Sequence, residues 1–427
     1  MAFMDRVRKL LKRKPKNKPA ANGNTQPPAV QKNNQAVSQQ QQPQQAAIPG
    51  DGQDDARAAP RVAATQSGKL QIALRNDTNS STVYAYVTGQ AIDNNNALFL
   101  LGADGNTPVF PTSPSSTGQK ITQDISVRLG APGSTTTITI PKLAGGRIWF
   151  SIGTPLQFAL NPGPGLVEPS VFNQADPNIN TNFGFAEFTF NEAQVFVNIS
   201  YVDFVSIPVA LSLRDTTGKT QAVSGLPANG LQTIAEGLRA QTAKDGRRWS
   251  SLIVNGPNGQ PLRILSPNSG LLINPTWFRD YYLDHVNRVW DKYRVQQLTV
   301  DTQASFGEIN GQVTSANVLD LGPAGTFQKP STGDIFSCST GPFATGSNAA
   351  RNAVIPRLAA AFNRSTLLVS QETPNGTRPA QYYQAPITNV SSVSMLFYLL
   401  YQNANMPQHY SRVVHDANLD KHGYAFP

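Results

Sequence analysis

Alternation of apolar and polar residues dominates the chain from about residue 69 to residue 213. Runs such as LQIALR, STVYAYVTGQAI and TTTITIP repeat the two-residue period of half-buried β-strands, with Gly, Asn, Pro and Ser between them. Short strands at this spacing are typical of a β-sandwich or barrel. Residues 69–213 are therefore predicted to form an all-β domain.

Helical periods appear after about Leu213, and strand-like runs lie between them. The aromatic residues of the central helix fall on one face, which indicates a core position. Helices are predicted over residues 231–241, from Asn274 and Pro275 onward, and over residues 348–363 with a bend or restart at Pro356.

These patterns predict a chain that is mainly β, with a smaller α/β domain over residues 214–375. Residues 376–427 are expected to return to the β-domain. Two domains with a cleft between them would suit an extended polymer as ligand.

Residues 1–68 follow neither period and are rich in Gln, Asn, Pro and Ala, which predicts a disordered tail. Residues 1–20 carry eight Lys or Arg against one Asp, so they hold +7 of the net charge of +9. Residues 1–18 fit a basic amphipathic helix that binds an anionic membrane, RNA or an import receptor. A solvated end without a partner fits equally well.

The tail does not resemble a secretory signal, because its apolar run is only Leu10 and Leu11 and more Lys follows. We therefore expect a cytoplasmic or non-classically exported protein, and a monomer.

Cysteine and histidine are scarce in the chain. Cys338 is the single cysteine, so an intrachain disulfide is excluded. Its side chain is predicted to be buried. The four histidines show no metal-ligand spacing with cysteines or acids. We expect no metal and no cofactor.

Two carboxylates interrupt apolar strand-like runs: Glu187 in FAEFTF and Asp203 in VNISYVDFV. Burying a carboxylate is costly without a partner or a chemical role, so this pattern suggests an acid and base pair such as glycosidic hydrolysis requires. Aromatic neighbours should hold at least one proton near neutral pH. Two carboxylates on the wet face of a half-exposed sheet would give the same spacing.

Longer motifs favour the first interpretation. GRIWFSIGTPLQFAL, FAEFTFN, NISYVDFVSIPVALSL, PSTGDIFSCSTGPF and HYSRVVH, in this order, resemble glycoside hydrolase family 64 endo-β-1,3-glucanases, relatives of the thaumatin-like proteins. The resemblance covers nearly everything after about residue 69. It implies an inverting mechanism with Glu187 as general acid and Asp203 as general base, and glucan contacts at Thr189 and Asn191. A fungal source with a role at the cell wall is expected.

A glucan-binding surface should combine aromatic rings with amides and carboxylates. Phe183 and Asp176 are predicted to bind the sugar, Phe183 at a position where the family often carries Trp. Glu168 and Glu192 are rival catalytic acids. We rank both lower because their turn-like contexts favour solvation over a raised pKa.

The spacing of the two acids poses a geometric problem. A tight hairpin after Phe190 would set Asp203 level with residue 182 or 183, roughly 13 Å along the strand from Glu187. Inverting pairs stand about 6.5–9.5 Å apart. We therefore predict a wide loop or bulge around residues 191–194 that brings the acids level.

The C-terminal part departs from the family, which runs from Thr-Asn directly into HYSRVVH. Here residues 390–408 intervene. Their length and codon possibilities fit a retained in-frame intron, and a true loop insertion is the alternative. Relatives usually also continue beyond GYAFP with an acidic segment.

Three function classes follow from the sequence. The first is a β-1,3-glucan hydrolase, and the second is a non-catalytic glucan-binding module. The third is a viral coat protein, because a basic arm before a β-domain is also typical of RNA-packaging capsids. The nearly neutral charge after residue 20 disfavours the third class.

Overall fold

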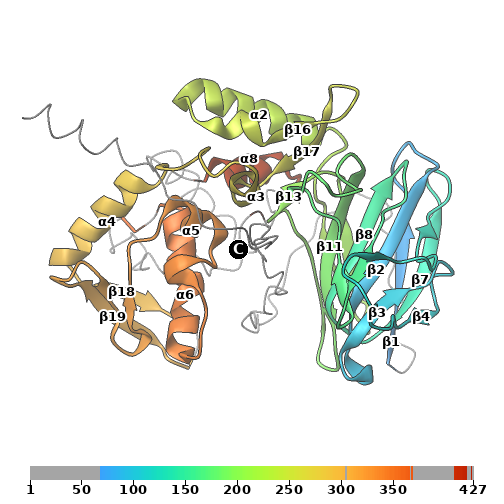
Figure 1. Cartoon of the computed structure of the whole chain (residues 1–427), viewed down its shortest axis with the longest axis horizontal. Coiled ribbons are helices and arrows are strands. Elements are labelled where there is room, and N and C mark those ends of the chain that lie inside the picture. The colour runs from blue at the N-terminus through green and yellow to red at the C-terminus, as the bar shows by residue number, and fades with distance from the viewer. Residues whose placement is uncertain (1–67, 303–304, 366, 369–407, 421–424, 426–427) are drawn as a thin grey trace, which may run out of the picture. The chain divides into compact units, whose positions relative to one another are not determined.

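The computed structural model describes residues 68–302, 305–365, 367–368, 408–420 and 425 (Figure 1). The predicted tail (apart from Gly68) and, apart from Gln408, the suspected insertion lie outside these residues. Within the described part, no helix is long and apolar enough to cross a membrane.

The largest sheet has seven antiparallel strands in the order β12-β11-β8-β2-β3-β4, with β6 also paired to β2 (Figure 1). Its strands are β2 (Val83–Ala91), β3 (Ala97–Leu101), β4 (Pro108–Val109), β6 (Val127–Arg128), β8 (Leu143–Ile152), β11 (Asn182–Phe190) and β12 (Val195–Ile199). The two-stranded sheet of β1 (Lys69–Arg75) and β7 (Thr135–Pro141) packs on one of its faces.

Alternation along the strands gives this sheet two apolar faces. One face meets β1 and β7 through residues such as Val87, Ile148 and Phe188. The other carries Tyr86, Trp149 and Phe185, which join the core of the helical part of the chain. A small third sheet contains β5 (Gln119–Lys120), β9 (Ala159–Asn161) and β10 (Gly165–Val167).

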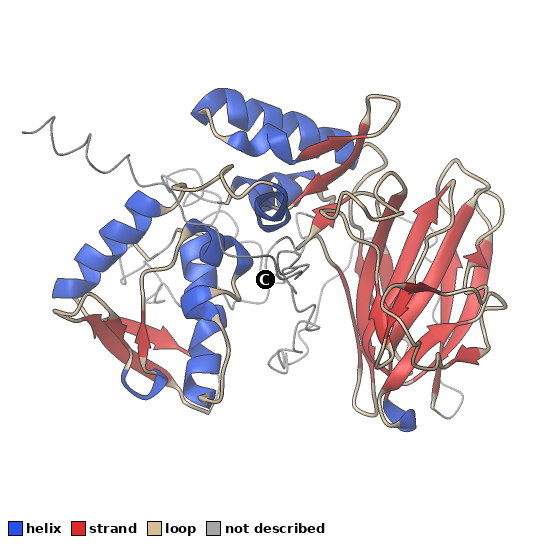
Figure 2. Ribbon diagram, in the orientation of Figure 1, coloured by secondary structure: helices blue, strands red, loops and turns tan. Residues whose placement is uncertain are grey.

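Helices and shorter strands follow β12, as Figure 2 shows. The strands are β13 (Phe204–Val205), β14 (Leu211–Arg214), β15 (Thr220–Val223), β16 (Ile253–Asn255), β17 (Pro261–Leu265), β18 (Leu298–Asp301), β19 (Glu308–Val313), β20 (Leu319–Asp320) and β21 (Thr326–Phe327). The helices are α2 (Gly230–Asp245), α3 (Pro267–Ile273), α4 (Leu283–Val295), α5 (Thr332–Ser337), α6 (Ala349–Asn363) and α8 (His409–Ala417). Single turns of 3-10 helix are η1 (Ile92–Asn94), η2 (Arg248–Leu252), η3 (Gly322–Ala324) and η4 (Gly341–Phe343).

The predicted mainly-β fold is confirmed, and the predicted helices exist with changed bounds. The second helix does not begin at Asn274, which instead ends α3 and whose Oδ1 accepts hydrogen bonds from Thr276. The chain then makes a turn that buries Phe278 before α4 starts. The third helix runs through Pro356 without an interruption.

The apolar face predicted for the second helix is confirmed, because Val286, Val289 and Tyr293 are all buried. Cys338 is also buried, as predicted, and its Sγ lies 2.9 Å from Nδ2 of Asn363.

Gly146 offers a direct test of the packing beneath the sheet. It pairs with Phe188, and three atoms of that ring would lie 2.7 Å or less from an added Cβ. We expect Gly146→Ala to lower the free energy of unfolding by about 1–3 kcal/mol, because a buried ring must move. Thermal or urea unfolding measures this loss.

Gly333→Ala is the matched control, since the atom nearest to its added Cβ lies at 3.7 Å. Unchanged stability in the Gly146 variant would show that the sheet tolerates the extra methyl group.

Candidate active site

Four polar side chains form a row across the large sheet, on the face opposite β1 and β7. Thr88 of β2 pairs with Arg147 of β8, which pairs with Glu187 of β11, which pairs with Asn198 of β12. Residues at matched register on antiparallel strands project from the same face, so these side chains are neighbours. Nδ2 of Asn198 is buried, with no hydrogen-bond partner among the described residues.

Arg147 connects this row to a second element. Its Nε and Nη2 lie 3.3 Å and 3.2 Å from Oε1 of Glu187, and its Nη1 lies 2.5 Å from Oε2 of Glu168. The guanidinium also lies over the rings of Phe185 and Trp149, at 4.8 Å and 5.6 Å. Burial alone would lower the pKa of Arg147, but attraction from Glu168, Glu187 and Asp203 raises it above its ordinary value.

Glu168, which directly follows β10, belongs to the site. Burial raises the pKa of the Glu168 carboxyl, with repulsion from Glu187 adding to this effect, while Arg147 and a hydrogen bond from Thr88 oppose it. Our reason for ranking Glu168 low, a solvated turn, is therefore wrong. Glu192 is different, because its side chain is 84% exposed and pairs with Lys142 at the surface.

Asp203 reaches the site from outside the large sheet. The chain leaves β12 after Ile199, and the residues directly after Asp203 form β13, which pairs with β17. The backbone N–H of Ser266 donates to the Asp203 carbonyl at 2.9 Å. Two residues earlier, the Tyr410 hydroxyl of α8 donates to the Tyr201 carbonyl at 2.6 Å. The helical part of the chain thus holds the Asp203 segment on both sides.

Asp203 interacts electrostatically with Arg147 and Glu187, so it belongs to the same site. Burial raises the pKa of the Asp203 carboxyl, Arg147 opposes this rise, and the charge of Glu187 adds to it. Desolvation of Asp203 by its aromatic neighbours stays a prediction, with which the burial of Asp203 agrees. The side chains of Glu187, Glu168 and Arg147 remain 27–31% exposed, so the cluster is recessed yet reachable from solvent.

The wide loop predicted around residues 191–194 is absent, because Phe190 pairs with Val195 and the Asn191 N–H donates to the Gln194 carbonyl at 3.1 Å. This turn is tight. A register shift does occur in β11, but it lies in the pairing with β8, between Phe188 and Phe190. Asp203 does not follow the strand register because the chain leaves β12 at Ile199, before it reaches Asp203. A wide loop is not the cause.

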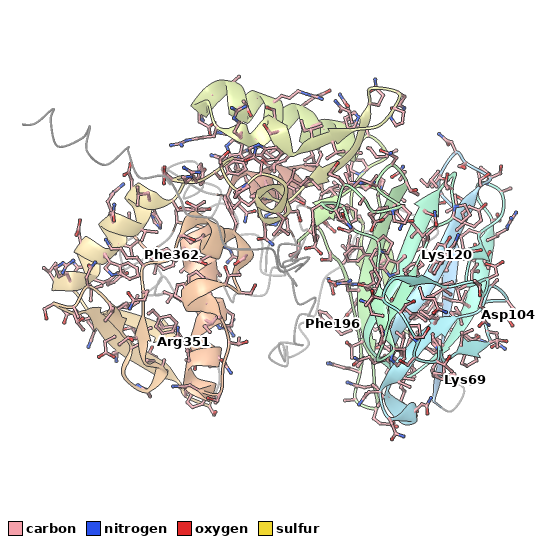
Figure 3. The ribbon with its side chains drawn as sticks, in the orientation of Figure 1. Lys69, Asp104, Lys120, Phe196, Arg351 and Phe362 are labelled. Carbon is pink, nitrogen blue, oxygen red and sulfur yellow. The ribbon has the colours of Figure 1, made fainter. Side chains whose placement is uncertain are left out.

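Thr189 and Asn191, which are predicted to contact the ligand, lie at the end of β11 next to the turn into β12. Thr189 projects from the same face as Glu187 and pairs with Phe196. The Oδ1 of Asn191 accepts from the N–H groups of Ala193 and Gln194 and closes the turn. Phe196, which is 38% exposed on the edge strand β12, was not predicted from the sequence (Figure 3).

Phe183 and Asp176 lie in the interior and not at an accessible surface. Phe183 is 0% exposed and packs against Trp149, Phe204 and the guanidinium of Arg263. It therefore has no face for a sugar ring, and the structure assigns it to the core.

Asp176 is 8% exposed, and its carboxylate accepts from the N–H groups of Ser170 and Asn178. It organises the loop that follows Glu168. A direct role in sugar binding is not supported by this position.

Arg147 is the main residue that the sequence analysis missed. Its signal was present, since it is a lone charge in the apolar run GRIWFS, and the argument made for the two acids applies equally to it. Among the described residues, no three His, Cys, Asp or Glu side chains are grouped as metal ligands.

The model of glycoside hydrolase family 64, described as "Beta-1,3-glucanase", matches residues 68–427. Two curated proteins named glucan endo-1,3-beta-glucosidase, from the bacteria Cellulosimicrobium cellulans and an Arthrobacter species, are 28% and 27% identical over 261 residues. The matched region is 60% of this chain and 46% of each relative. The chain thus matches about half the length of these relatives.

Solved structures cover more of the fold. A laminaripentaose-producing β-1,3-glucanase in complex with laminaritetraose is 29% identical with a TM-score of 0.68, over 84% of this chain and 92% of that chain. A β-1,3-glucanase domain from Clostridium beijerinckii has a TM-score of 0.62 at 20% identity, over 86% and 93% of the two chains, which supports the fold alone.

The raised pKa of Asp203 predicts a stability effect with a defined sign. Its folded-state pKa lies above the unfolded value, so ionisation of this carboxyl opposes folding. The penalty is absent at low pH and grows as pH rises through the carboxyl range. Asp203→Asn should therefore raise the melting temperature at pH 7 by about 2 °C, and the gain should shrink toward pH 3.

Asp215→Asn is the control, because hydrogen bonding from Thr217 lowers the pKa of that exposed carboxyl and reverses the sign. A loss of stability in the Asp203 variant at pH 7 would contradict the assignment.

Proposed function

Because this chain belongs to glycoside hydrolase family 64, the β-1,3-glucanase family, we propose that it hydrolyses internal bonds of β-1,3-glucan by an inverting acid and base mechanism. One observation carries the proposal. Arg147 bonds to Glu187 and is electrostatically coupled to Asp203, although these two carboxylates come from different elements. A carboxyl pair of this kind is what glycosidic hydrolysis requires.

Glu187 is the general acid in this mechanism and protonates the glycosidic oxygen as the bond to the anomeric carbon breaks. Asp203 is the general base and removes a proton from the water that attacks that carbon from the opposite side. The raised pKa of Asp203 makes its carboxylate a stronger base once it is ionised. We expect the two carboxyl carbons to stand about 6–10 Å apart, with room for this water.

The glucan is proposed to bind along the end of β11 and β12 that lies next to the turn at residues 191–194. Thr189 and the Nδ2 group of Asn191 can bond to sugar hydroxyls, and the exposed ring of Phe196 can stack on a sugar face. A relative solved in complex with laminaritetraose supports a β-1,3-linked ligand.

Further parts of the proposal rest on the sequence. These are the thaumatin-like lineage, a cleft between the β-domain and a smaller α/β domain, a fungal source and a cell-wall role. A non-catalytic glucan-binding module is the second candidate, and membership of a hydrolase family disfavours the coat protein. Release of reducing sugar from laminarin separates the two remaining candidates.

Glu187→Gln should reduce turnover of laminarin by at least about a thousandfold while leaving glucan binding within about threefold of wild type. The amide keeps the shape of the side chain and loses the transferable proton. Reducing-sugar release measures turnover, and affinity electrophoresis in a laminarin gel measures binding. Activity close to that of wild type would move the acid role to Glu168.

The anomeric form of the first product tests the mechanism. Hydrolysis of a β-linkage with inversion releases an α-configured reducing end, which proton NMR detects before mutarotation. Initial appearance of the β-anomer would rule out the inverting role of Asp203.

A further inference from the structure

Arg147 contacts two carboxylates with unequal geometry. Its Nη1 meets Glu168 at 2.5 Å, whereas its closest approach to Glu187 is 3.2 Å. Arg147 thus makes one shorter contact with Glu168 and two longer contacts with Glu187. Its charge is shared between the two carboxylates.

We propose that Glu168 is a positioning residue that holds Arg147 and neutralises its charge, so that Glu187 keeps the proton it must donate. This inference rests on the proposed function, in which Glu187 is the general acid. Glu168 acts only through Arg147 and does not contact the scissile bond.

The groups around Glu168 support this role. Arg147 of β8 and the Thr88 hydroxyl of β2 stabilise its ionised form, while Glu187 of β11 repels it. Thr88 is oriented by the Trp149 indole, which donates to its Oγ1 at 3.2 Å. Among the described residues, Asp203 is a further carboxylate that interacts with Arg147. One cation thus faces three carboxylates.

Electrostatics give the direction of the effect. An opposite charge a few ångströms away favours the ionised form of a carboxyl group, and a like charge disfavours it. With Glu168 ionised, Arg147 and Glu168 together present nearly no net charge to Glu187. Removing the Glu168 charge leaves an uncompensated cation beside Glu187, which favours loss of the proton.

The test is the pH dependence of kcat/KM on linear β-1,3-glucan for Glu168→Gln. Activity falls on the basic side as the general acid loses its proton, so this limb should move to lower pH by about one unit. A merely structural role would lower activity at every pH and leave the limb in place.

Glu192→Gln is the matched control, because it removes the same charge from an exposed side chain in the turn between β11 and β12. Glu168→Asp keeps the charge, and its basic limb should stay within about 0.3 units of wild type. Equal shifts in Glu168→Asp and Glu168→Gln would assign the effect to packing and overturn the proposal.

Thr88→Val tests the same coupling if Glu168→Gln does not fold. Loss of the hydroxyl removes a hydrogen bond that stabilises the ionised form of Glu168. The basic limb should therefore again move to lower pH, by roughly half as much. An unmoved limb in both variants, beside an active wild-type enzyme, overturns the role of Glu168. A wild-type protein that releases no sugar instead overturns the proposed function, so the two failures are distinguishable.

Discussion

A single guanidinium among three carboxylates is the interaction on which the site depends. Arg147 lies on rings of Trp149 and Phe185, so its charge must be compensated by groups held at fixed positions. Glu168 supplies one shorter contact and Glu187 two longer ones. Burial raises the pKa of Glu168 and of Asp203, and the charge of Arg147 opposes both shifts.

The second constraint is that the site is assembled from both halves of the described fold. The large sheet supplies Arg147 and Glu187, whereas pairing of β13 with β17 places Asp203. The fully buried Arg263 of β17 adds a further link, because its guanidinium donates to the carbonyls of Ile179 and Thr181 in the loop that leads into β11. One strand, β17, therefore supports both sides of the site.

The sequence predicted the features that depend on short-range patterning. Two-residue alternation predicted β1, β2 and β7, and lone carboxylates in apolar runs pointed to Glu187 and Asp203. The neighbours of Glu187 on the site face of the sheet could not be predicted from the sequence. Its strand partner lies forty residues away on β8, and register is a property of the folded sheet. This is why the pairing of Arg147 with Glu187 and Glu168 was not predicted.

Local competition explains the other differences. The side chain of Asn274 bonds to Thr276 and makes a turn where helical spacing predicted a helix start. The side chain of Asn191 likewise closes a tight hairpin where the distance between the acids predicted a wide loop or bulge. Phe183 satisfied the composition expected of a sugar-binding surface, but composition does not distinguish a core ring from an exposed one.

The anchoring of the Asp203 segment has a consequence for synthesis on the ribosome. Phe204 needs Leu265 as its strand partner, and Tyr201 needs Tyr410 from the last helix of the described chain. A nascent chain therefore carries a finished large sheet long before Asp203 is anchored. The carboxylate pair is therefore assembled only after α8 has been synthesised.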